Sequence, residues 1–101
     1  MDYCLVYVTC KDEEEASLIA YDLVESNLVA CANVIPKITS IYKWEGEICK
    51  DSESVLILKT KKEKFSLIEN RVKELHSYDC PCVVSLDIDQ GSKEYLKFLS
   101  S

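Results

Sequence analysis

The spacing of apolar residues alternates along this chain between the period of a β-strand and that of an α-helix, and the order of these segments restricts the fold more than any other feature. Short runs rich in β-branched and aromatic residues predict strands over residues 3–9, 30–34, 38–44, 48–59 and 82–88. Helical spacing predicts a first helix that begins at Asp12 and that Asn27 can end in a left-handed conformation. It also predicts a second helix that runs to about residue 76 and a short tail helix that runs to about residue 99. Pro36 separates the second run from the third, so a bend or bulge is expected there.

Short polar motifs indicate where these segments begin and turn. Asp12 with Glu15, and Thr60 with Glu63, have the spacing of a capping box at the start of a helix. The sequence Glu45-Gly46-Glu47 predicts a tight turn between two strands, which makes a long hairpin.

The predicted order is strand, helix, strand, strand, helix, strand, helix. This order is typical of a ferredoxin-like βαββαβ sandwich, an α+β fold, here with a long β-hairpin and a short C-terminal helix. At 101 residues the chain makes a single domain, residues 1–101. The last strand alternates between apolar and polar residues, and the side expected to face the core carries Cys82, Val84, Leu86 and Ile88. Two helices cover only one face of the sheet, so we expect further copies of the chain to cover the other.

The composition excludes several classes of function. A net charge of −6 repels nucleic-acid backbones and anionic membrane surfaces, so neither is an expected partner. The two glycines, Gly46 and Gly91, are too far apart for a phosphate-binding loop. The N-terminal residues lack the basic start of a signal peptide, and no apolar run approaches the ~20 residues that span a bilayer. We therefore expect a cytoplasmic protein.

The six cysteines are scattered, and only Cys80 and Cys82 lie close together in sequence. Their Cys-Pro-Cys spacing differs from the Cys-x-x-Cys of redox and structural zinc sites. Regular periodicity and few glycines disfavour a disulfide scaffold. One interpretation is that most cysteines are free thiols in or near the core. The alternative is that some bind a soft metal ion, because thiolates select Cu(I) and zinc.

Several short motifs, spread in order over nearly the whole chain, carry a family resemblance. They are residues 8–10 (VTC), 28–36 (LVACANVIP), 38–46 (ITSIYKWEG), 51–53 (DSE), 58–60 (LKT), 76–78 (HSY), 90–91 (QG) and 95–96 (YL). In this order and spacing they resemble the CutA divalent-cation tolerance family. The resemblance implies a homotrimer related to the PII signalling proteins, with the hairpin and the tail completing the subunit interfaces. It also implies a non-catalytic protein that responds to metal ions and binds copper or another divalent or soft metal ion, with no required cofactor.

The family's copper-ligand positions are only partly kept. Copper-binding bacterial members have a cysteine at the end of the first strand and two histidines after the second helix; those positions here are Thr9, Leu75 and His76. Cys10 would point to the opposite side of the sheet from Thr9 if the strand continued, so it is expected to serve only if the strand ends before it. The candidate metal ligands are His76, Cys10, Cys80 and Cys82.

Polar and aromatic positions of the family pattern add candidates for a cleft between subunits. These are Cys31, Trp44, Glu53, Lys59, Tyr78 and Asp79. The plainer interpretation is that they form inter-subunit packing and a polar network, and that His76 is a favourable cation at the end of a helix.

Two other functions stay open. A PII-like signalling or scaffold trimer would bind a small anionic ligand or a partner protein in its inter-subunit clefts, although Arg71, the sole arginine, makes a poor phosphate cradle. A small hydrolase of the same fold would need an arginine in its first loop, where residues 10–14 are acidic.

Overall fold

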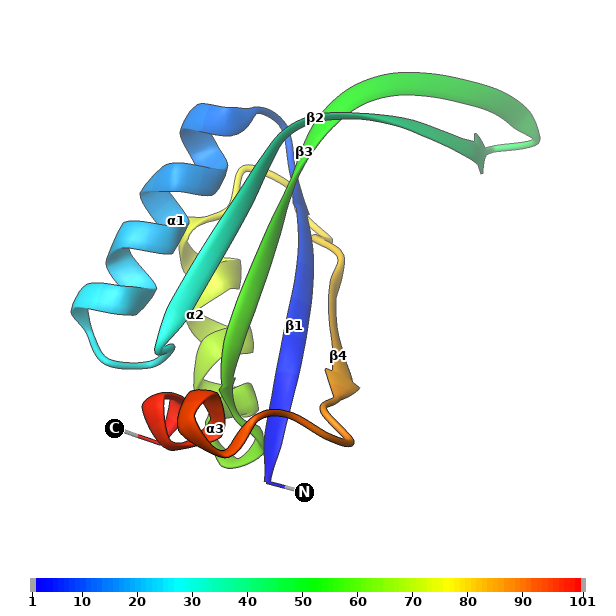
Figure 1. Ribbon diagram of the computed structural model, residues 1–101. Coiled ribbons are helices and arrows are strands. Elements are labelled where there is room, and N and C mark those ends of the chain that lie inside the picture. Colours follow the sequence, from blue (N-terminus) through cyan, green and yellow to red (C-terminus); the bar gives the residue numbers. More distant parts are fainter. Residues whose placement is uncertain (1, 101) are drawn as a thin grey trace.

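A computed structural model, which describes residues 2–100, has the predicted order of elements (Figure 1). The strands are β1 (Tyr3–Cys10), β2 (Cys31–Trp44), β3 (Glu47–Lys61) and β4 (Val83–Asp87), and the helices are α1 (Glu13–Glu25), the short 3-10 turn η1 (Lys62–Lys64), α2 (Phe65–Leu75) and α3 (Lys93–Leu99). No helix among these residues is long and apolar enough to cross a bilayer.

The four strands form one antiparallel sheet in the order β2-β3-β1-β4, which confirms the ferredoxin-like α+β sandwich. Helices α1 and α2 lie side by side against one face of this sheet (Figure 1). Alternate residues of β1 are buried, from Cys4 to Cys10, because every second side chain points toward the helices.

The core lies between that face and the two helices. Ile19 and Leu23 of α1 and Ile68 and Val72 of α2 are at most 1% exposed. They follow the helical spacing that the sequence indicated, and each such side chain contributes roughly 1.5–3 kcal/mol through burial. The rest of the core comes from the helix-covered face of the sheet and includes Leu56 and Leu58 of β3.

Asp12 caps the start of helix α1 as predicted, whereas the side chain of Glu15, the other half of the expected capping box, binds Lys11 and Ser77 instead. The carboxylate of Asp12 accepts a hydrogen bond from the backbone N–H of Glu15 at 2.9 Å. At the other end Asn27 adopts a φ of 62°, the left-handed conformation that commonly follows a helix.

The expected capping box at the start of α2 is wrong. Thr60 lies within β3, pairs with Cys4 of β1, and is 2% exposed. Its hydroxyl donates to the carbonyl oxygen of Leu28 at 2.8 Å instead of capping a helix. Thr60 belongs to the sheet because its burial continues the alternating pattern of β3. Helix α2 begins later in the chain, after η1.

The hairpin formed by β2 and β3 extends well beyond the rest of the sheet (Figure 1). Strand β1 pairs with β3 only from Ser54 to Lys61, so the outer part of β3 pairs with β2 alone. The turn at Glu45 and Gly46 has two positive φ angles, 49° and 82°, as a two-residue hairpin turn requires. The predicted irregularity at Pro36 is confirmed as a register shift between Ile35 and Ile38.

The expected orientation of the last strand is wrong. Leu86 pairs with Leu5 and Val84 pairs with Tyr7, so both face away from the helices and are 55% and 49% exposed. Val83, which was expected to face solvent, packs against the core. Pairing with β1 sets the register of this edge strand, and its apolar side joins the uncovered face of the sheet.

Candidate functional site

Three side chains that can ligate a metal ion meet in a buried cluster at one end of the sheet. Cys10 is the last residue of β1, Glu15 lies in the first turn of α1, and His76 directly follows α2. The ligand atoms of these three residues all lie within 4.8 Å of one another. They are 0%, 8% and 9% exposed. We call this group the buried cluster.

The imidazole of His76 uses both of its nitrogens. Nε2 lies 2.8 Å from the carbonyl oxygen of Thr9, and Nδ1 accepts a hydrogen bond from the backbone N–H of Tyr78 at 3.1 Å. Because Nδ1 is an acceptor, the proton of the neutral ring belongs on Nε2, which donates to Thr9. Nδ1 is also the nitrogen nearest Glu15, at 3.7 Å from Oε1.

The carboxylate of Glu15 joins two loops. Oε1 accepts the backbone N–H of Lys11 at 3.1 Å, and Oε2 accepts that of Ser77 at 3.0 Å. Burial by itself would raise the pKa of Glu15, but the hydrogen bonds from Ser77 and Lys11, together with the nearby His76, lower it overall. The group is therefore a carboxylate, and it ties the start of α1 to the segment that follows α2.

The thiol of Cys10 is held in its protonated form. Burial, with the carboxylates of Glu15, Glu53 and Asp12 as further causes, raises its pKa to about 12. A thiolate is the form that binds metal, so a cation entering this cluster must displace the proton.

The structure brings Cys10 close to His76 although the strand does not end before it. The strand continues through Cys10, which therefore points to the opposite face from Thr9. His76 nevertheless lies on that side as well, with a ligand nitrogen within 4.8 Å of the thiol of Cys10. The sequence argument missed this because it located the site by the position of Thr9.

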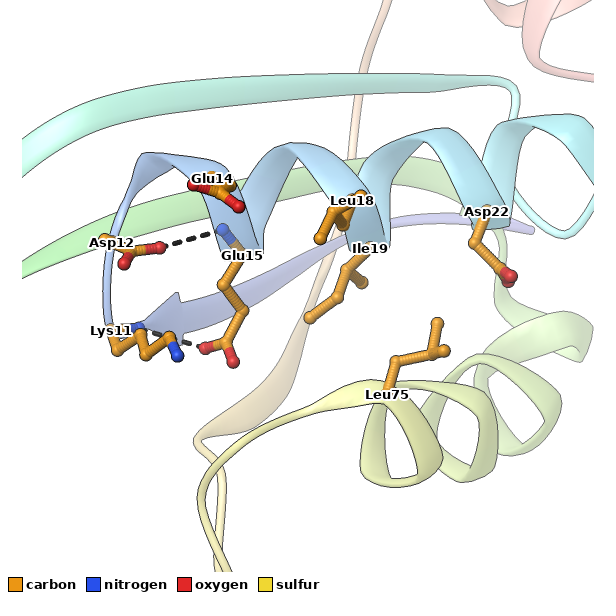
Figure 2. A pocket seen from close by; sticks show the side chains of 8 residues that line it. All are labelled: Lys11, Asp12, Glu14, Glu15, Leu18, Ile19, Asp22 and Leu75. Atoms are coloured by element: carbon orange, nitrogen blue, oxygen red, sulfur yellow. Dashed lines mark hydrogen bonds between the residues drawn. The ribbon is translucent and has the colours of Figure 1, made fainter.

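Glu15 was not among the candidates from the sequence, where it was interpreted only as a cap. Its signal was its place in the first turn of α1, five residues after Cys10, the buried residue that ends β1. Figure 2 shows its side chain extending from α1 toward the backbone of Lys11. It borders a shallow hollow of about 440 Å³ whose apolar wall is formed by Leu18, Ile19 and Leu75.

A wider groove lies between the hairpin and the segment that joins α2 to β4. Its volume is about 760 Å³, and it is lined by Thr9, Lys11, Tyr42, Trp44, Asp51, Ser52, Glu53, Tyr78, Asp79, Cys80 and Cys82. We call it the hairpin groove. Its three carboxylates face a single lysine, so its charge favours cations and disfavours an anionic ligand.

Tyrosine–carboxylate pairs order the hairpin groove. The hydroxyl of Tyr78 donates to Glu53 at 2.8 Å, and that of Tyr42 donates to Asp51. The hydrogen bond to Asp51 is the main cause that raises the pKa of Tyr42 to about 12. Burial, followed by the bond to Glu53, raises the pKa of Tyr78. Tyr78 therefore links the two sites, since its backbone binds His76 and its hydroxyl binds the groove.

The structure separates the sequence candidates into three places. Cys10 and His76 lie in the buried cluster, whereas Cys80 and Cys82 line the hairpin groove. Of the cleft candidates, those in the groove are Trp44, Glu53, Tyr78 and Asp79. Cys31 and Lys59 pair with each other across β2 and β3, on the face of the sheet away from α1 and α2. The Nζ of Lys59 lies 5.3 Å from the ring centre of Tyr95 in α3.

Comparison with known proteins agrees with this architecture. The family model described as CutA1 divalent ion tolerance protein matches residues 4–101. The chain is 45% identical over 95 residues to the divalent-cation tolerance protein CutA of Thermus thermophilus, covering 94% of this chain and 92% of that protein. It is 46% identical to the CutA homolog of Xenopus laevis over 92% of this chain, but spans 62% of that longer protein.

A solved structure confirms the fold independently of these motifs. The periplasmic divalent cation tolerance protein CutA from Archaeoglobus fulgidus superposes with a TM-score of 0.94 at 39% identity, covering 97% of this chain and 95% of that chain. The motifs, the topology and the family match agree over almost every residue, and the chain belongs to the CutA1 divalent ion tolerance family.

Proposed function

We propose that this protein is a non-catalytic homotrimer that binds a divalent or soft metal ion and takes part in the response to such ions. The single observation that carries the proposal is the buried cluster, in which a thiol, a carboxylate and an imidazole converge within 4.8 Å. Relatives named for divalent-cation tolerance support the same role.

The donors of the buried cluster fit a borderline or soft ion such as zinc or copper. Sulfur, imidazole nitrogen and carboxylate oxygen are all ligands of zinc, and hard ions such as Mg²⁺ prefer oxygen alone. Cys10 would supply Sγ, Glu15 a carboxylate oxygen, and His76 the Nδ1 atom that already faces Glu15.

Binding carries a local cost. His76 must release the backbone N–H of Tyr78 from Nδ1, and Cys10 must lose its proton. A bound cation offsets the second cost because its charge favours the thiolate. Affinity is therefore expected to rise with pH, as protons and metal compete for Cys10.

Titration of the reduced, metal-free protein with Zn²⁺ against a chromogenic chelator tests the proposal. Cys10→Ser, Glu15→Gln and His76→Asn are each expected to weaken binding by about tenfold or more. Cys4→Ser is the matched control, because Cys4 is also buried on the same side of β1 but lies outside the cluster. Zinc affinity that is equal in all five proteins would contradict the proposal, and circular dichroism would establish that each variant is folded.

The uncovered face of the sheet supports assembly with further copies of the chain. Half-buried or exposed apolar residues gather there: Leu5, Tyr7, Ile35, Ile57, Val84 and Leu86. The hairpin adds Ile41, Trp44 and Ile48, which are 68%, 64% and 76% exposed. A soluble monomer rarely leaves an apolar surface of this kind open to water.

We also propose that the protein works in the cytoplasm. All six cysteines are free, including the exposed pair Cys80 and Cys82. Free exposed thiols persist in a reducing compartment, and an oxidising one tends to convert them to disulfides.

A further inference from the structure

Two exposed thiols share one wall of the hairpin groove. Cys80 and Cys82 lie in the segment between α2 and β4, separated by Pro81, and both line the groove. Trp44 of the hairpin and Tyr78 of the same segment lie along it as well. The buried cluster uses neither of these thiols.

The local sequence favours a shared side for the two thiols. A proline restricts the residue before it to extended conformations, so Pro81 keeps Cys80 out of a helical turn. Cys82 directly precedes β4 and continues the chain into the sheet. In an extended segment, residues two apart place their side chains on the same side. The lining of the groove by both thiols agrees with this arrangement.

Soft thiol donors and harder carboxylate donors both line the groove. Two thiolates one residue apart can hold one soft ion, whereas the carboxylates of Glu53 and Asp79 also line the groove and attract cations to it. Both thiols are exposed, so an ion reaches them without displacing any core side chain. Cys10, by contrast, is 0% exposed.

We propose that Cys80 and Cys82 form a second metal site, a chelating dithiolate pair on the wall of the hairpin groove that binds a soft ion such as Cu(I). Each thiol releases its proton to solvent, two metal–sulfur bonds form, and the ion keeps its oxidation state. This site is separate from the buried cluster. Tyr78 lies between the two, since its backbone N–H donates to His76 and its hydroxyl to Glu53 of the groove.

An anaerobic titration with Cu(I) against a chromogenic chelator tests the second site. The Cys80→Ser/Cys82→Ser double variant is expected to lose one bound Cu(I) per chain, with affinity at that site reduced by about a hundredfold. The matched control is Cys31→Ser/Cys49→Ser, which removes two half-buried thiols outside the groove and is expected to keep that ion.

The variants also separate this site from the proposed function. If Cu(I) binding persists in the Cys80→Ser/Cys82→Ser variant but is lost in Cys10→Ser, the second site does not exist and the buried cluster binds the ion. If Cys10→Ser loses Zn²⁺ binding but keeps the Cu(I) that depends on Cys80 and Cys82, both sites stand. If only the groove variant loses metal, the second site stands and the buried cluster is structural.

A trivalent organoarsenical gives a second measurement that needs both thiols at once. Phenylarsine oxide exchanges its As–O bond for two As–S bonds and releases one water. One adduct per chain is expected by native mass spectrometry, and either Cys80→Ser or Cys82→Ser alone is expected to abolish it. An adduct that survives in both single variants would show that the two thiols do not act as a pair.

Discussion

The backbone N–H of Tyr78 donates to Nδ1 of His76 at 3.1 Å, so the imidazole nitrogen nearest Glu15 is occupied by a neighbour only two residues along the chain. The same ring binds the carbonyl oxygen of Thr9 through Nε2. His76 therefore holds the end of β1 to the segment after α2, and a metal ion must compete with a bond that already exists. Metal binding and local structure are coupled through this one side chain.

Replacing His76 by alanine is expected to destabilise the protein even without metal. The carbonyl oxygen of Thr9 and the backbone N–H of Tyr78 both lose a partner in a partly buried place, where an unsatisfied group costs at most about 1–3 kcal/mol. Urea unfolding of metal-free protein at one concentration measures the effect. Leu75→Ala, at the neighbouring and more exposed position, is the control expected to change the free energy of unfolding less. Equal losses in the free energy of unfolding of the two variants would contradict the conclusion that His76 holds β1 to the segment after α2.

Native thiol labelling is expected to distinguish the cysteines by position. Cys4 and Cys10 are buried, and burial raises the pKa of Cys4 and raises that of Cys10 to about 12. Iodoacetamide at pH 8 should therefore modify the exposed Cys80 and Cys82 long before these two. Peptide mass spectrometry over time follows each site, and urea-unfolded protein should label at all six positions. Rapid modification of Cys10 in the native state would show that the buried cluster is open to solvent.

The ion pair between the two helices predicts a dependence of stability on pH. Arg71 donates to both carboxylate oxygens of Asp22, at 2.9 and 2.7 Å, and these bonds lower the pKa of Asp22 below its usual 3.8. A lowered pKa in the folded state means that the stabilisation is present above pH 3.8 and is lost as pH falls through the folded value. Asp22→Asn should lose this part of the dependence, and a small effect is expected because the pair is partly exposed. Unfolding curves for the two proteins from pH 6 to pH 2 should converge at the acid end; parallel curves would contradict the assignment.

The uncovered sheet face predicts which substitution breaks the proposed homotrimer. Leu86 is 55% exposed on that face, next to Leu5 on β1. Leu86→Glu is expected to place an unpaired charge in the interface and to shift the mass measured by light scattering from three times 11.5 kDa toward one chain. Leu67→Glu, a similar change 58% exposed on α2, is the control expected to leave the trimer intact. A monomeric protein before any substitution would refute the proposed assembly.

The order of elements could be predicted from the sequence because each segment has a strong local pattern. These patterns depend only on residues close by in the sequence. Examples are the apolar spacing of Ile19 and Leu23, the left-handed Asn27 and the turn at Gly46. Thr60 could not be assigned correctly, because the same residue suits a helix cap and a strand, and only pairing with Cys4 decides between them. The face of Leu86 likewise depends on register with β1, which no local pattern contains.

The residues of the candidate site could likewise be predicted only in part from the sequence. His76 and Cys10 could be proposed from their residue types and from the family resemblance. Glu15 could not, because its second oxygen binds Ser77, a residue 62 positions away. The tie between these segments comes from the packing of α1 beside α2, and the buried cluster is a product of that packing.

Anomalous diffraction at the zinc edge, from crystals of the wild-type protein soaked with Zn²⁺, tests the central claim most directly. We predict an anomalous peak bonded to Sγ of Cys10, a carboxylate oxygen of Glu15 and Nδ1 of His76, with the backbone N–H of Tyr78 released from the ring. A cluster without a peak, with the hydrogen bond from Tyr78 to His76 intact at saturating zinc, would contradict the account and leave these three residues as a structural clasp.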